Sequence, residues 1–359
     1  MHLGIPALLD FFTQHRTDES LVLATIIDTE GSTYRKPGAM MLISRDGAFE
    51  GMISGGCLEG DLLHHAADVF ASGEAAFVTY DMHAGEDLVW SLGLGCDGVI
   101  HLKLQRLDRQ DGFGFLEQLE ASHKARRSAL VALVLRSTAG MPGNSCALLD
   151  EDGNSTGAPA LLSVLKDAAE DWPGWRSRKI FVDEGDGSVE IMLVQAPRQT
   201  RVLICGAGPD AVPVAGALCG LDWDVHVVDH RPAFARPDRF PSNCSVVQAW
   251  PGRLGESVTL DDMDAVVIMS HHLENDAAYL RSLAGHGISY VGVLGPAARK
   301  GRLCDMADYA GGPVHGPVGL DIGAELPSAI ALSIAAEIHA VLNRRDGRPL
   351  TLKVQSNER

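Results

Sequence analysis

GSTYRKPGAMMLISRDGAFEGMISGGCLEGD, residues 31–61, is the stretch around which the rest of the chain is organised. The apolar run at residues 39–44 suits a buried strand. Asp46 and Gly47 then mark a tight turn, and residues 49–54 resume as a second strand. The stretch therefore predicts a strand hairpin that leads through a glycine-rich loop into a helix.

The glycine-rich loop carries the first candidate site. Gly55 and Gly56 permit positive φ angles and let backbone amides approach a ligand closely. Cys57 follows them, and apolar residues recur at helical spacing from Leu58 onwards. A thiolate at a helix N-terminus is stabilised by the helix macrodipole and can act as a nucleophile or a soft metal ligand. The alternative is that Cys57 is a small buried apolar residue.

Two further features accompany Cys57. Arg35 and Lys36 precede the hairpin and are candidates for contacting an anion, with plain solvation as the alternative. Cys96 is a second cysteine flanked by glycines, just before a strand predicted at residues 99–104. Two cysteines in glycine-rich turns would form a soft-ligand site if the fold brings them together.

Length and composition limit the classes of protein to consider. A chain of 359 residues predicts about two domains. A net charge of −17 argues against nucleic-acid and anionic membrane partners. The cysteines form no CxxC pair, so a zinc finger and a disulfide framework are not predicted, and a reducing cytoplasm is expected. We predict no signal peptide, and no apolar run reaches the ~18 residues of a membrane span.

Residues 129–197 weakly echo residues 20–106, which suggests a duplicated β-rich unit; chance similarity between hairpins is the alternative. A charged helix is expected to connect them at residues 107–128. The second copy lacks both glycine–cysteine loops, so chemistry is expected in the first. The matching positions are Thr29, Gly31, Gly38, Asp46 and Gly47 with Thr138, Gly140, Gly143, Asp152 and Gly153.

The chain changes character at about residue 200. RVLICGAGPDAVPVAGALCGLDWDVHVVDHRP, residues 201–232, predicts a strand, a glycine turn, a helix and a second strand. Gly206 and Gly208 begin a G-x-G-x-x-A pattern, whose glycines let a pyrophosphate approach the backbone. Asp229 ends the second strand, where an acid binds the ribose hydroxyls of NAD and disfavours NADP. An NAD(P) site is therefore predicted.

Further strands are expected at residues 245–248, 264–269 and 289–294, with a long final helix at residues 327–344. The carboxyl ends of such strands converge on one crevice. His271 follows one of them and is a candidate contact for a nucleotide or cofactor, with a packed or solvated histidine as the alternative. His272 would point the other way on a strand, so a shared metal is not expected unless the loop turns there.

Both halves of the chain resemble the XdhC/CoxI family. The resemblance is carried by GSTYRKPGAMMLISRDG, SGGCLEG, VDHRP, YVGVLGPAARKGRL and GLDIGAELPSAIALSIAAEI, and covers nearly the whole chain. It implies an α/β chain: a β-rich α+β domain at residues 1–197, a Rossmann-like doubly wound parallel sheet at residues 200–345 and a tail at residues 346–359. The family often has Gly-Cys-Gly-Gly at the second cysteine. Here Asp97 follows Cys96, which puts the role of Cys96 in doubt.

The resemblance also implies a function. Family members are accessory proteins that hold the molybdenum cofactor (molybdopterin), protect it while a cysteine desulfurase-type partner sulfurates it, and insert it into an apo molybdenum hydroxylase such as xanthine dehydrogenase. Cys57 would be the principal contact to the molybdenum and Cys96 a second one. Arg35, Lys36 and the amides near Gly55 would hold the phosphate. A cytoplasmic homodimer is expected.

Two other classes of function stay open. The chain could be an NAD(P)-dependent oxidoreductase that uses the Rossmann crevice, or a regulatory module that senses NAD(H). No G-x-x-x-x-G-K-[ST] loop and no G-x-S-x-G elbow occurs. The resemblance favours a non-catalytic cofactor chaperone, and whether the chain is also an enzyme stays open.

Overall fold

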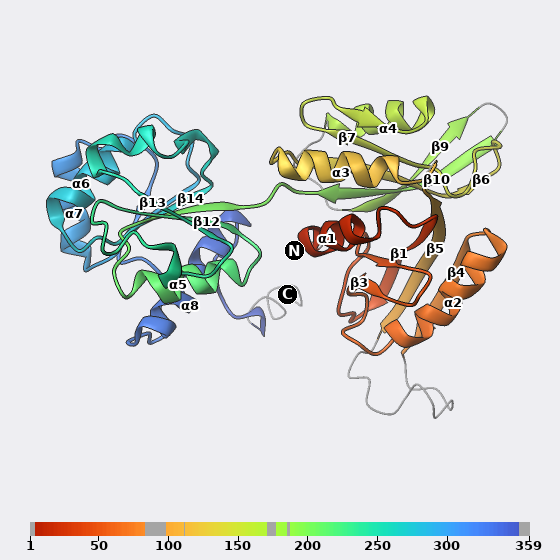
Figure 1. Cartoon of the computed structure of the whole chain (residues 1–359), viewed down its shortest axis with the longest axis horizontal. Coiled ribbons are helices and arrows are strands. Elements are labelled where there is room, and N and C mark those ends of the chain that lie inside the picture. The colour runs from red at the N-terminus through yellow and green to blue at the C-terminus, as the bar shows by residue number, and fades with distance from the viewer. Residues whose placement is uncertain (1–3, 83–97, 111, 171–176, 185–186, 352–359) are drawn as a thin grey trace, which may run out of the picture. The chain divides into compact units, whose positions relative to one another are not determined.

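The structure is a computed structural model of the chain. It describes residues 4–82, 98–110, 112–170, 177–184 and 187–351. The chain folds into two compact units, Met1–Arg198 and Gln199–Arg359. In Figure 1 the first unit runs from red to yellow-green and the second from green to blue.

The first half of unit 1 is an antiparallel sheet with strand order β3-β2-β1-β5-β4. The long pair β1 and β5 forms its centre. One helix precedes β1 and another connects β3 to β4. The elements are α1 (Ile5–His15), β1 (Ser20–Gly31), β2 (Met40–Ile43), β3 (Phe49–Gly51), α2 (Glu59–Ser72), β4 (Ala76–Asp81) and β5 (Gly98–Asp108).

The second half of unit 1 repeats this arrangement, with strand order β8-β7-β6-β10-β9. Its elements are α3 (Gly114–Lys124), β6 (Ala129–Ser137), β7 (Cys146–Asp150), β8 (Ser155–Thr156), α4 (Pro159–Ala169), β9 (Arg178–Glu184) and β10 (Gly187–Ala196). Both halves run helix, three strands, helix, two strands. The match supports the proposal that residues 20–106 and 129–197 are copies of one unit.

Alternation of side chains along the strands gives each sheet two apolar faces. Leu21 and Leu23 of β1 join a core shared with α1, α3 and the second sheet. Val22 and Ala24, on the opposite face of β1, pack beneath α2. The outer face of the second sheet is covered in the same way by α4. Unit 1 therefore holds two sheets face to face, each with a helix on its outer side.

Unit 2 is a six-stranded parallel sheet of order β13-β12-β11-β14-β15-β16, which is the Rossmann order. Helices α5 and α8 cover one face and α6 and α7 the other, so the predicted fold class is confirmed. The strands are β11 (Arg201–Cys205), β12 (Asp224–Asp229), β13 (Cys244–Gln248), β14 (Ala265–Ile268), β15 (Tyr290–Val293) and β16 (Val314–His315). The helices are α5 (Ala211–Cys219), α6 (Leu273–Ser282), α7 (Ala297–Ala307) and α8 (Pro327–Leu342).

Two predicted boundaries were wrong. The connecting helix was expected from residue 107. Instead, β5 continues to Asp108, which pairs with Ser20 of β1, and α3 begins only at Gly114. The strand expected to reach residue 54 ends at Gly51, because the next residues turn toward Glu59. Among the described residues, no helix is both long and apolar enough to cross a membrane.

Candidate functional site

The loop between β3 and α2 presents Cys57 on the surface of unit 1. Gly55 and Gly56 have φ angles of 88° and 109°, in a region that favours glycine. Helix α2 begins at Glu59, two residues after the cysteine. The exposed thiol excludes the alternative that Cys57 is a buried apolar residue.

The loop is wrapped around the carboxylate of Glu59, which is buried. One carboxylate oxygen accepts hydrogen bonds from the amides of Ile53 and Ser54, at 3.1 and 2.9 Å. The other accepts from the Ser54 hydroxyl at 2.7 Å and from the amides of Gly56 and Leu58 at 2.9 and 3.2 Å. Glu59 is thus the residue that shapes the turn carrying Cys57.

Glu59 was not predicted as a site residue, although an acidic residue in a first helical turn is a recognisable signal. Burial raises the pKa of Glu59, but hydrogen bonds from Ser54 and Ile53 outweigh it and hold the pKa below its usual value. The side chain is therefore a carboxylate at neutral pH, and its charge already compensates the N-terminus of α2. The amides of Gly56 and Leu58 are engaged by Glu59, so these two are not free to hold a phosphate, and the predicted role of the amides near Gly55 stays a prediction.

An aromatic side chain and an arginine lie beside the turn. A Cβ added to Gly55 would be 3.9 Å from three ring atoms of Tyr34, so the Tyr34 ring lies over Gly55. That ring is 56% exposed. Arg35 is half-buried, which lowers its pKa, and its Nε has no hydrogen-bond partner in the described structure. Lys36 is exposed and donates to the Thr33 hydroxyl at 3.3 Å.

A cavity of about 380 Å³ adjoins the loop within unit 1. Asp61 accepts a hydrogen bond of 2.6 Å from the Tyr80 hydroxyl and lies 3.4 Å from the His65 ring. The volume of the cavity falls in the range of small-molecule sites. Leu58, which follows Cys57 in the sequence, is the residue of the loop that lines this cavity. Its lining residues are Leu58, Asp61, His65, Phe77, Val78, Thr79, Tyr80, Asp81 and Met82.

The second predicted cysteine, Cys96, lies outside the residues that the structure describes. Its predicted role beside Cys57 therefore stays a prediction. Among the described residues, no group of three or more His, Cys, Asp or Glu side chains is arranged to hold a metal ion.

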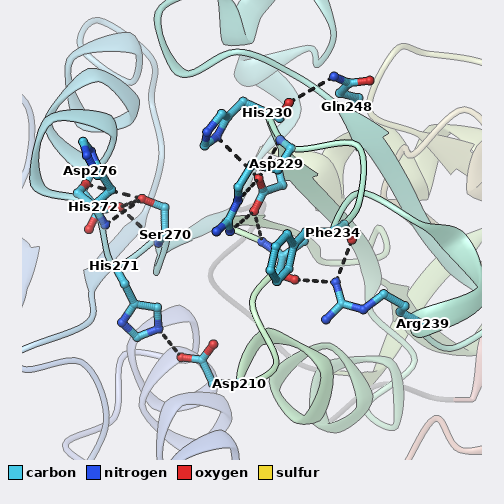
Figure 2. Close-up of polar contacts among 12 residues, drawn as sticks. Asp210, Asp229, His230, Phe234, Arg239, Gln248, Ser270, His271, His272 and Asp276 are labelled. Carbon is cyan, nitrogen blue, oxygen red and sulfur yellow. Dashed lines mark hydrogen bonds and ion pairs between the residues drawn. The ribbon is translucent and has the colours of Figure 1, made fainter.

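The second candidate site is the carboxyl edge of the sheet in unit 2, shown in Figure 2. Gly206 has a φ of 112°, and a Cβ there would lie 2.7 Å from the backbone of Met269. The Ala207 amide donates to the Asp229 carboxylate at 2.8 Å. The glycine turn and the acid at the end of β12 therefore lie together, as the motif predicts.

Asp229 is not free to receive a ribose. Its side chain is 1% exposed. Arg231 folds back on it, with contacts of 2.9 Å from the backbone amide, 2.9 Å from Nε and 2.7 Å from Nη2. Burial raises the pKa of Asp229, but the bonds from Arg231 and Ala207 outweigh it and lower the pKa overall. The expected ribose acceptor is thus already engaged, and the predicted NAD preference lacks its structural basis here.

A carboxylate also occupies the place expected for a pyrophosphate. Asp210 immediately precedes α5, and a Cβ on Gly208 would lie 2.7 Å from its Oδ1. Its other oxygen is 2.6 Å from Nε2 of His271, which is 60% exposed and has a φ of 61°. Helix N-termini bind phosphates through free amides and a positive dipole end. The Asp210 side chain makes no capping hydrogen bond to α5, so it is the negative charge of the carboxylate that opposes a phosphate here.

The other charges at this edge are also paired. Asp276, almost fully buried, is 2.6 Å from Arg299 and accepts hydrogen bonds from Ser270. His272 lies 3.5 Å from Glu274, whereas His271 contacts Asp210. This edge keeps the backbone geometry of a dinucleotide site, but Asp210, Asp229 and Asp276 each contact a basic side chain of the same unit.

Comparisons with known proteins agree with this two-unit architecture. The XdhC and CoxI family model matches residues 14–81, and the XdhC Rossmann domain model matches residues 202–338. A Bacillus subtilis protein described as a probable xanthine dehydrogenase component is 29% identical over 338 residues, covering 94% of this chain and 96% of that protein.

Two further relatives are similar over most of the chain. The molybdenum cofactor insertion chaperone PaoD of Escherichia coli is 27% identical, over 89% of this chain and 83% of that protein. A crystal structure described as a xanthine dehydrogenase from Bacillus halodurans superposes with a TM-score of 0.75 at 29% identity, covering 96% of this chain and 97% of that one. Matches to both family models and near full-length similarity to these relatives show that the chain belongs to the XdhC/CoxI family.

Proposed function

We propose that this protein is an accessory factor that carries the molybdenum cofactor, protects it during sulfuration and inserts it into a molybdenum hydroxylase such as xanthine dehydrogenase. The single observation that carries the proposal is the exposed thiol of Cys57 on a turn that Glu59 fixes, one residue before Leu58, which lines a cavity of ligand size. The similarity to a molybdenum cofactor insertion chaperone supports this choice of cargo.

Each residue of the loop has a role in this proposal. The Cys57 thiolate is a soft donor, which suits a molybdenum–sulfur centre better than a hard cation. The exposed face of Tyr34 is available for the flat pterin ring, since offset stacking favours such contacts. The phosphate of the cofactor is assigned to Arg35, because the amides of Gly56 and Leu58 already bind Glu59. Glu59 positions the thiol without contacting the cargo.

The partners follow from the same proposal. The cofactor has to be received, sulfurated by a cysteine desulfurase-type enzyme and released to an apo-hydroxylase, so the thiol must be reachable by other proteins. An exposed loop on a rigid sheet meets that requirement. We expect a cytoplasmic homodimer that is not itself a catalyst.

The test is to produce the protein in a host that makes molybdenum cofactor and to measure molybdenum and pterin per purified chain. Cys57→Ser keeps the size of the side chain but removes the soft donor, so the chain should fold and lose its cofactor. Cys146→Ser is the matched control in unit 1, because burial raises the pKa of the Cys146 thiol to about 11 and keeps it from acting as a thiolate. Full cofactor retention by Cys57→Ser would refute the role of the thiol.

A further inference from the structure

Strand β9 (Arg178–Glu184) is an edge strand of the second sheet in unit 1, at the end of the order β8-β7-β6-β10-β9. Within the described residues it pairs with β10 alone. Phe181, in its middle, is 74% exposed. A long edge strand with an exposed aromatic residue is a template for pairing with another strand, and proteins normally cover or charge such edges.

The hydrogen bonds of the neighbouring strand β10 show which backbone groups of β9 face outward. Ser188 of β10 exchanges bonds of 2.9 Å with Thr138, through its amide and its carbonyl, and so points away from β9. Ser188 is the register partner of Asp183. The two therefore form a non-hydrogen-bonded pair, which leaves the N–H and C=O of Asp183 facing outward. By the alternation of antiparallel strands, the same holds for Phe181 and Lys179.

The sequence of β9 is complementary to itself about Phe181. In an antiparallel pair of two β9 strands with a twofold axis at this residue, Phe181 lies opposite its own copy. Lys179 then faces Asp183 of the second copy, and Ile180 faces Val182. The three residues with outward backbone groups, Lys179, Phe181 and Asp183, fall in register, so each exchanges both of its hydrogen bonds. Aromatic, aliphatic and opposite-charge pairs are all favourable across antiparallel strands.

The surroundings of the strand suit the same arrangement. Ile180 and Val182 pack against the apolar cluster beneath α4, so a second β9 would extend that apolar face. Lys179 already lies 2.5 Å from Asp28 of β1 in the first sheet, so a contact with Asp183 of a second copy would be a second ion pair of the same ammonium group. We propose that β9 is the surface through which two copies of this chain associate, by antiparallel pairing centred on Phe181. This interface is separate from the Cys57 loop and does not depend on the cofactor.

Charge variants at the twofold position test the proposal by sedimentation velocity over a range of protein concentrations. The parent protein should form a dimer. Phe181→Lys and Phe181→Glu each place like charges opposite each other, so each should raise the dimer dissociation constant at least ~10-fold. An equal mixture of the two variants should restore the dimer, because lysine then faces glutamate. Recovery in the mixture cannot come from misfolding of either variant.

Phe49→Lys is the matched control, since Phe49 is an exposed phenylalanine on β3, the edge strand of the other sheet. It should leave the dissociation constant unchanged. The proposal is overturned if the parent protein sediments as a single chain at every concentration. It is equally overturned if either single variant dimerises like the parent, or if the mixture stays monomeric.

Discussion

Replacing Glu59 by glutamine tests the geometry on which the candidate cofactor site rests. The carboxylate accepts two hydrogen bonds on one oxygen and three on the other. In Glu59→Gln one oxygen becomes an NH₂ group, so at least the amides of Ile53 and Ser54 meet a donor instead of an acceptor. A buried donor left unsatisfied costs about 1–3 kcal/mol. We take the lower end of this range for each of the two amides, because Ser54 is only half-buried. The turn should therefore lose about 2 kcal/mol of local stability.

The assay is amide hydrogen exchange of the loop, read by mass spectrometry. A loss of about 2 kcal/mol corresponds to a ~30-fold fall in protection of residues 53–58. Glu74→Gln is the control, because Glu74 is an exposed glutamate just beyond the other end of α2. Cofactor retention should fall with protection, since Cys57 loses its fixed position. Unchanged protection in Glu59→Gln would show that the carboxylate does not hold the turn.

The pH dependence of the same measurement has a definite sign. The pKa of Glu59 lies below its usual value of 4.5 in the folded protein. Its stabilisation is therefore fully present above pH 4.5 and is lost as the pH falls through the folded value. The parent and Glu59→Gln should differ at neutral pH and converge in acid.

Two further predictions concern other sites. If the Asp210 carboxylate excludes phosphates from the start of α5, calorimetry should detect at most weak binding of NAD and NADP, and Asp210→Asn should tighten both about tenfold; tight binding of NAD by the parent would contradict this. Burial lowers the pKa of Lys103 to about 8, so the folded protein should gain up to about 3 kcal/mol of stability as the pH rises from 8 toward 10.5. In denaturant unfolding, Lys103→Met should lack that gain in the free energy of unfolding. If the parent and the variant showed the same pH dependence, the gain would not come from Lys103.

The architecture of unit 2 was predictable because its signals are local. Gly206, Gly208 and Asp229 mark a strand–turn–helix–strand order that fixes the sheet, and all lie where the motif places them. What the sequence could not reveal is that Arg231 reaches back to Asp229. Likewise, the pairing of Asp210 with His271 joins loops that are 61 residues apart. Such side-chain contacts depend on rotamers and on long-range packing, which no spacing rule encodes.

The same limit explains what was missed around Cys57. The two glycines and the helix that follows were recognisable, because positive φ angles and apolar periodicity leave local traces. Glu59 looked like an ordinary surface acid of a first helical turn. Its burial results from the loop that closes over it, and the sequence alone does not show that closure. A glycine-rich turn has no side chains to order it, so an internal anion is one physical way to fix its amides.

The two halves of unit 1 differ where a functional site would be added. Gly51 and Gly157 occupy similar places, Gly51 as the last residue of β3 and Gly157 directly after β8. Each has a φ above 110°, and a Cβ on either would lie within 2.7 Å of the second strand of its own half. After Gly157 the chain enters α4 almost at once, at Pro159. After Gly51 it detours through residues 52–58 before α2 begins.

This detour contains Cys57 and the amides that bind Glu59, and the second half has no counterpart to it. If the halves are copies of one unit, the second preserves the scaffold without the loop. The other half forms the same strand order without a counterpart of residues 52–58, although Ile53 and Leu58 are buried in the core of the first sheet. The segment therefore combines two core residues with amides that bind a buried carboxylate and with an exposed thiol, and the thiol is the part that packing does not account for.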